Sequence, residues 1–132
     1  MWNACNLEEI TMNRLSKEDT KILEHLIYLP LLLTVLERDY QQAKTTPFKL
    51  NQVYLNLIEH TMKKVQDDLK GFKEKMRQKK IKLIKGNLDK NFTEYHYYVA
   101  NYHEVHRFAN TELKANTEKL LSYYLFKENG VF

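Results

Sequence analysis

Apolar residues recur at alternating steps of three and four between positions 55 and 76, and charged residues occupy most positions between them. This heptad pattern is typical of a long helix that buries one apolar stripe against another helix. The pattern predicts a helix that runs to about Lys80 and is capped by Asn51 or Thr46. The stripe, which we call the heptad seam, consists of Leu55, Ile58, Met62, Val65, Leu69, Phe72 and Met76.

The segment before the seam predicts a second long helix. Ser16 followed by Asp19 resembles a capping box, and the helix is expected to run from there to about Gln42. Apolar residues between positions 22 and 36 cover too much of the circumference for a surface helix, so this one should be central. Pro30 removes a backbone donor, which predicts a kink or a break into two helices.

The C-terminal half is expected to add two more helices after a short extended piece from Lys80 to Lys85 and a turn at Gly86-Asn87. The third would be capped by Asn91 and carry Phe92, Tyr95, Val99, Tyr102 and either Val105 or His106. The fourth would begin at Asn110 or Thr111 and bury Leu113, Leu120, Leu121, Tyr124 and Leu125. The predicted fold is an all-α, single-domain bundle of about four helices over residues 16–132, with residues 1–15 as a loose tail.

Composition agrees with a soluble helical domain of 132 residues: 43% hydrophobic, 29% charged, and only three glycines and two prolines. The single cysteine, Cys5, excludes an internal disulfide, so the cytoplasm is the expected compartment. The longest apolar run, residues 27–36, covers about half of the ~20 residues needed to cross a bilayer. We therefore expect no membrane partner.

Charge is unevenly distributed along the chain. Residues 63–90 hold 11 basic and 4 acidic residues, a net charge of +7, whereas the whole chain carries +4. A cationic end on a long helix could bind nucleic acid. Cations near a helix C-terminus also simply offset its dipole, and only Phe72 supplies an aromatic ring among them. The predicted basic patch is Lys73, Lys75, Arg77, Lys79, Lys80, Lys82 and Lys85.

Histidines offer the one hint of a metal site. On a helix, His103 and His106 at i, i+3 are neighbours and are the weak candidates, whereas His96 would lie about 10 Å from His103. The simpler interpretation is that they fill space between tyrosines. The chain has no Glu-x-x-His pair, nucleophile motif or phosphate-binding loop, so we expect no enzyme activity and no cofactor.

Tyrosines gather in the C-terminal third, and consecutive pairs cannot all face one core. Tyr97, Tyr98 and Tyr123 are therefore expected to form a face. Such a face suits a protein interface, and it equally suits the wet edge of a bundle.

Several short strings together resemble the small YhjD-like proteins of Bacillus-type Firmicutes. They are Tyr28-Leu29-Pro30, Leu36-Glu37-Arg38-Asp39, Pro47-Phe48-Lys49-Leu50, Tyr54-Leu55-Asn56-Leu57-Ile58-Glu59 and Tyr123-Tyr124-Leu125-Phe126. The resemblance covers about residues 17–127. It implies a cytosolic bacterial protein and transfers no catalytic residue.

These observations favour a non-enzymatic interaction module that self-associates or clamps another helical protein. The predicted interaction seam is Leu69, Phe72 and Met76, together with the tyrosine face, because the other helices should cover the earlier part of the stripe. The alternatives are a nucleic-acid-binding protein that uses the basic patch and a metal-binding helical bundle.

Overall fold

The chain folds into three α-helices and a three-stranded antiparallel sheet over residues 16–100 and 102–127, which the computed structural model describes. The elements are α1 (Lys17–Thr45), α2 (Asn51–Gln78), β1 (Ile81–Leu88), β2 (Phe92–Val99), β3 (Tyr102–Ala109), α3 (Asn110–Ser122) and the π-helical segment η2 (Tyr123–Lys127). The predicted all-α helical bundle is therefore wrong, and the fold is α+β. The tail predicted for residues 1–15 lies outside the described residues.

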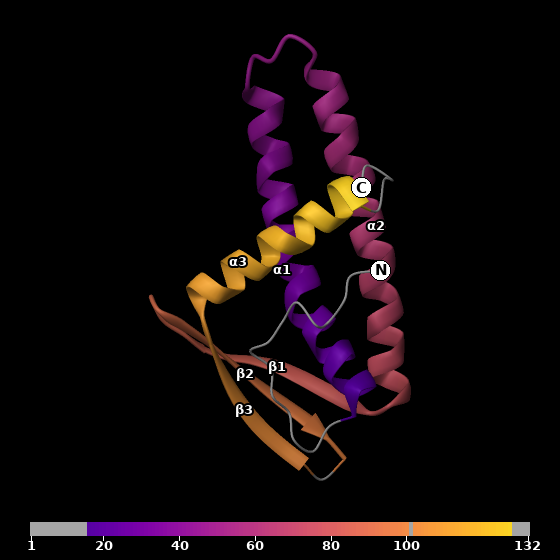
Figure 1. Cartoon of the computed structure of the whole chain (residues 1–132), viewed down its shortest axis with the longest axis vertical. Helices are drawn as coiled ribbons and strands as arrows, with labels where there is room; N and C mark the ends of the chain where they lie inside the picture. The colour runs from indigo at the N-terminus through magenta and orange to yellow at the C-terminus, as the bar shows by residue number, and fades with distance from the viewer. Residues whose placement is uncertain (1–15, 101, 128–132) are drawn as a thin grey trace.

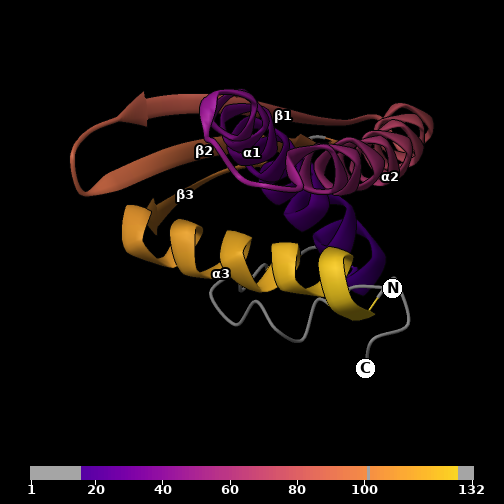
Figure 2. The same ribbon diagram turned by 90° about the horizontal axis from the view of Figure 1, so that it is seen from above.

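The two long helices form an antiparallel hairpin that reaches far from the sheet. The turn that joins α1 to α2 lies at the opposite end of the molecule from β1, β2 and β3 (Figure 1). The helix α3 crosses the hairpin on the side of α1 that is away from β1 (Figure 2). We call residues 37–60, the part of the hairpin beyond α3, the arm.

Helix α1 is the central element, as its pattern predicts. All eight side chains from residue 22 to residue 29 are buried. The Ser16 hydroxyl accepts a hydrogen bond from the Asp19 amide at 3.0 Å, which confirms the predicted cap. The helix continues without interruption through Pro30, so the predicted break is wrong, while the kink stays a prediction.

Helix α2 confirms the helix predicted from the heptad seam, but its predicted caps are wrong. Neither Asn51 nor Thr46 caps it; the Asn51 amide instead donates to the Ala43 carbonyl at 2.7 Å and fastens the turn of the hairpin. At the other end, the Lys79 ammonium reaches the Asp19 carboxylate at 2.9 Å. The hairpin is thus tied at both ends.

The third helix predicted for this chain is in fact the hairpin of β2 and β3. The residues alternate between the two faces of the sheet, so the three-four spacing read from the sequence was coincidental. Thr93, Tyr95 and Tyr97 point into the core, and Glu94, His96 and Tyr98 point to the outer face. The turn expected at Gly86-Asn87 is also wrong, because β1 continues to Leu88 with a register shift after Lys85.

Helix α3 starts at Asn110, where the last predicted helix begins. Hydrogen bonds between described residues join this end of the chain to the long helices. The Asn116 amide donates to the Tyr28 hydroxyl at 3.1 Å, and the Tyr124 hydroxyl donates to the Asp68 carboxylate at 2.5 Å. None of the helices in the described part of the chain is long and apolar enough to cross a membrane.

Candidate functional site

The predicted interaction seam is covered by the protein itself. Leu69 is 8% exposed and Phe72 is 5% exposed, and Met76 packs against the same core. The Phe72 ring stacks on His25 of α1, with ring centroids 4.0 Å apart and planes 15° apart. The expectation that this end of α2 waits for a partner is therefore wrong.

His25, the residue that covers Phe72, is itself almost completely buried. Its Nδ1–H donates to the Lys21 carbonyl at 2.7 Å. Burial lowers the pKa of His25 from its ordinary value of 6.5 to about 4, because the charged ring would lose its hydration. The ring is therefore neutral near pH 7 and serves the packing of α1 on α2.

The exposed apolar surface lies at the other end of the hairpin. Five large apolar side chains between residues 48 and 57 are between 41% and 69% exposed. Residues 48–57 span the turn between α1 and α2 and the beginning of α2, at the end of the molecule opposite the sheet (Figure 1). We call this set the apolar tip: Phe48, Leu50, Val53, Tyr54 and Leu57.

Contacts within the hairpin hold the apolar tip in place. The rings of Phe48 and Tyr54 contact each other, with centroids 5.2 Å apart. Below them, the Tyr40 hydroxyl of α1 donates to the Glu59 carboxylate of α2 at 2.5 Å. This bond raises the pKa of Tyr40, because it favours the protonated hydroxyl. The sequence did contain a signal for the apolar tip, namely apolar residues next to the first positions of the heptad seam. Reasoning from the seam alone did not identify them as an exposed surface.

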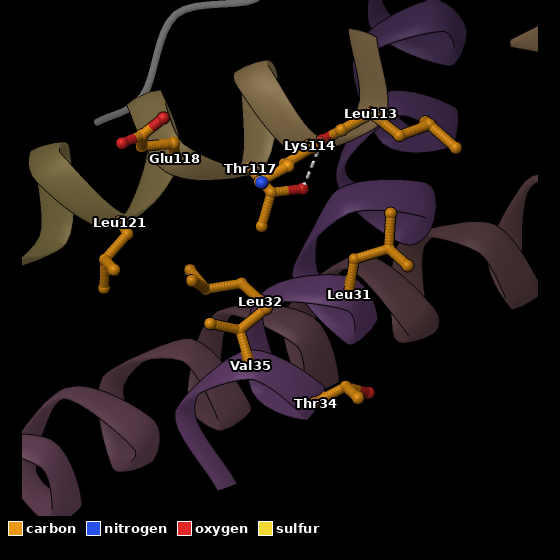
Figure 3. Close-up of a pocket in the computed structure, with 9 residues that line it drawn as sticks. All are labelled: Leu31, Leu32, Thr34, Val35, Leu113, Lys114, Thr117, Glu118 and Leu121. Atoms are coloured by element: carbon orange, nitrogen blue, oxygen red, sulfur yellow. Dashed lines mark hydrogen bonds between the residues drawn. The ribbon is translucent and has the colours of Figure 1, made fainter. Parts of the chain in front are cut away.

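A second apolar surface is the groove of about 390 Å³ between α1 and α3. In Figure 3, Leu113 and Leu121 of α3 lie across from Leu31, Leu32 and Val35 of α1. The polar groups at its rim are Thr34, Lys114, Thr117 and Glu118. The groove therefore offers apolar contact, and its lining holds no nucleophile and base in contact.

Part of the predicted basic patch is already engaged within the chain. Lys79 contacts the carboxylates of Glu18 and Asp19 at 3.0 and 2.9 Å, and Arg77 contacts Glu74 at 3.1 Å. These contacts reduce the charge that remains for a phosphate backbone, and nucleic-acid binding stays a prediction. The other members are Lys73 and Lys75 on α2, Lys80 in the link, and Lys82 and Lys85 on β1.

The three tyrosines of the predicted face do not lie together. Tyr97 is fully buried on the inner side of β2, and burial raises the pKa of its hydroxyl. Tyr98 is on the outer face and stacks on His103, with centroids 4.4 Å apart. Tyr123 is half-buried beside Tyr124 at the end of α3. A single tyrosine surface therefore does not form.

The histidines are rearranged by the strands. His103 and His106 lie on opposite faces of β3, because an odd spacing reverses direction in a strand. His106 contacts Phe108, whereas Nε2 of His103 lies 3.2 Å from Nδ1 of His96 on β2. The pair that a helix would separate is thus the pair that meets. Within residues 16–100 and 102–127, no group of three or more His, Cys, Asp or Glu residues is placed to hold a metal ion.

Comparison with known proteins agrees with the resemblance seen in the sequence. The YhjD protein family matches residues 14–129. The uncharacterized protein YhjD of Bacillus subtilis (strain 168) is 31% identical over 115 residues, which are 87% of this chain and 96% of that protein. No solved structure matches the chain.

Proposed function

The chain belongs to the YhjD protein family, and we propose that it is a non-enzymatic interaction module that self-associates through the apolar tip. The observation that carries the proposal is the concentration of exposed apolar side chains at the end of the arm. Five of the eleven large apolar residues that are exposed in the described structure fall between residues 48 and 57. The surface involved is thus at the opposite end of α2 from the predicted interaction seam.

An apolar patch of ordinary size is enough for a weak interface between two copies. The largest apolar patch on a typical monomer is about 300–600 Å² and is often functional. Two such patches pressed together bury on the order of 1,000 Å², the lower limit for a specific interface. We therefore expect a dimer that forms in a concentration-dependent way.

The charge distribution favours a second copy of the chain as the partner that covers the apolar tip. Between residues 40 and 62 the formal charges are Lys44, Lys49 and Glu59, a net charge of +1. Between residues 63 and 90 the net charge is +7. Two copies would repel each other at the basic end and meet little repulsion tip to tip. The sheets of a dimer would then lie at opposite ends of the assembly.

Sedimentation of the purified chain over a wide concentration range tests the proposal. Leu50→Glu puts a charge on a side chain that is 69% exposed at the tip, and Leu88→Glu makes the same change at a 61% exposed position on β1. We expect Leu50→Glu to raise the dimer dissociation constant by about tenfold or more, a loss of about 1.4 kcal/mol. Leu88→Glu should leave it unchanged.

Three results would overturn self-association at the tip. One is a wild-type chain that stays monomeric at several hundred micromolar. Another is equal weakening by Leu50→Glu and Leu88→Glu. The third is a monomer that sediments with lipid vesicles and loses that binding in Leu50→Glu, because a membrane would then be the occupant.

A further inference from the structure

We propose that His96 and His103 form a binding site for one divalent transition-metal ion of the Zn²⁺ and Cu²⁺ type. The two imidazoles would be the protein ligands, and water would fill the other positions. Both side chains lie on the outer face of the sheet, where the exposed fraction of the His96 side chain is 28% and His103 is exposed. The site is therefore open to an ion from solvent.

The spacing of the two nitrogens carries the proposal. Nδ1 of His96 and Nε2 of His103 are 3.2 Å apart. Two imidazole nitrogens bound at about 2.0–2.1 Å to a tetrahedral ion are about 3.3–3.4 Å apart. The rings lie end to end, with centroids 5.5 Å apart, so each imidazole would turn by roughly 40° for its lone pair to point at an ion that replaces the hydrogen bond. The backbone already holds both ligands in place, because β2 and β3 are paired along their whole length.

The carboxylate of Glu94 prepares His96 as a ligand. Its Oε1 lies 3.0 Å from Nε2 of His96. With Nε2–H donating to Glu94, Nδ1 keeps its lone pair and faces His103. A carboxylate on the second ring nitrogen is the usual companion of a histidine that ligates a metal, because it fixes the tautomer and raises the basicity of the ligand. On binding, the Nε2 proton of His103 would move to its Nδ1, and both rings stay neutral.

Two further contacts fix the orientation of the rings. A Cβ at Gly86 of β1 would lie 2.8 Å from the His96 ring, so the imidazole occupies space that only glycine leaves open. Tyr98 stacks on His103 with planes 7° apart, and the His96 ring lies nearly parallel to the His103 ring, with planes 12° and centroids 5.5 Å apart. These contacts keep the two imidazoles next to each other on the outer face of the hairpin.

The donor set selects the class of ion. Two neutral imidazoles suit Zn²⁺, Cu²⁺ and Ni²⁺, whereas Mg²⁺ and Ca²⁺ prefer oxygen ligands. With two protein ligands, the site should bind more weakly than a structural zinc site, which has four. Its open positions would accept water or a donor atom from another molecule.

Calorimetric titration of the full chain with Zn²⁺ tests the site. We expect one ion to bind, with affinity reduced about tenfold or more in His96→Gln and in His103→Gln. His60→Gln, an exposed histidine on α2, is the matched control and should bind as the wild type does. Absence of Zn²⁺ binding to the wild-type chain overturns the proposal, and so does an affinity in His96→Gln or His103→Gln that equals the affinity of the wild type.

A second measurement separates direct ligation from a structural effect. Electron paramagnetic resonance of the Cu²⁺ complex should show two imidazole nitrogens in the wild type and one in either His variant. Gly86→Ala should weaken binding because the new methyl displaces the His96 ring, while circular dichroism should show an intact fold. A Cu²⁺ spectrum that is identical in the wild type and His103→Gln contradicts the assignment.

Discussion

The replacement of His25 by phenylalanine should remove a large part of the sensitivity of the fold to acid. His25 is 2% exposed and stacks on Phe72 between α1 and α2. A phenylalanine ring can keep this stacking. The bond from Nδ1 is lost, but the Lys21 carbonyl lies four residues earlier in α1 and still accepts the backbone amide of residue 25. The variant should therefore fold at neutral pH.

The magnitude follows from the pKa of His25. Burial is the main cause that lowers it from 6.5 to about 4; Lys21 and Lys75 lower it further, while Asp68 and the bond to the Lys21 carbonyl raise it. Between these values the unfolded chain binds a proton that the folded chain does not bind, so the free energy of unfolding falls as pH falls. The stabilisation is complete above 6.5 and is lost toward pH 4. From about pH 7.5 to about pH 5 the loss assigned to His25 is about 2 kcal/mol.

Urea unfolding at both pH values measures this loss. The free energy of unfolding of the wild type should fall by about 2 kcal/mol more than that of His25→Phe between the two pH values. His60→Gln, which changes an exposed histidine, should follow the wild type. If His25→Phe keeps the full acid dependence of the wild type, burial of a neutral imidazole is not its source.

Three further changes test the packing of the helices. Leu69→Glu places a charge in the core and should lower the free energy of unfolding by several kcal/mol, so that the helical circular dichroism signal is lost. A variant that stays folded but changes its oligomeric state would contradict burial of the seam. Ser16→Ala removes the bond to the Asp19 amide and should lower the free energy of unfolding by about 1 kcal/mol in urea titration, and an unchanged midpoint would show that the cap contributes nothing. Tyr28→Phe removes the acceptor of the Asn116 bond and should cost about 1 kcal/mol by thermal unfolding, whereas a more stable variant would argue against that bond.

The sequence predicted the two long helices well because helix signals are local. The spacing of apolar residues and the Ser16 cap identify α1, and the heptad seam identifies α2, with ends close to those observed. What the seam could not indicate is its partner. A stripe shows that one face is buried, but only the tertiary structure shows that His25 covers Phe72.

The sheet was not predicted because many of its residues cannot be classed as clearly apolar or clearly polar. Tyrosine and histidine dominate β2 and β3, and each can face the core or solvent. The adjacent Tyr97 and Tyr98 point to opposite faces, which is the period of a strand. The meeting of His96 with His103 depends on the pairing register of two strands, and a helical reading places them far apart.

Pro30 leaves one gap in the hydrogen bonding of α1. Because proline has no N–H, the carbonyl of Leu26 loses its partner in the helical ladder, although Leu32 and Leu36 beyond it are still buried in the core. The arm beyond this point is held chiefly by contacts within the hairpin. Local opening of the arm, residues 37–60, therefore need not disrupt the core, and amide hydrogen exchange should be faster in the arm than in residues 22–29. A partner that binds the apolar tip would therefore bind the part of the hairpin that opens most readily.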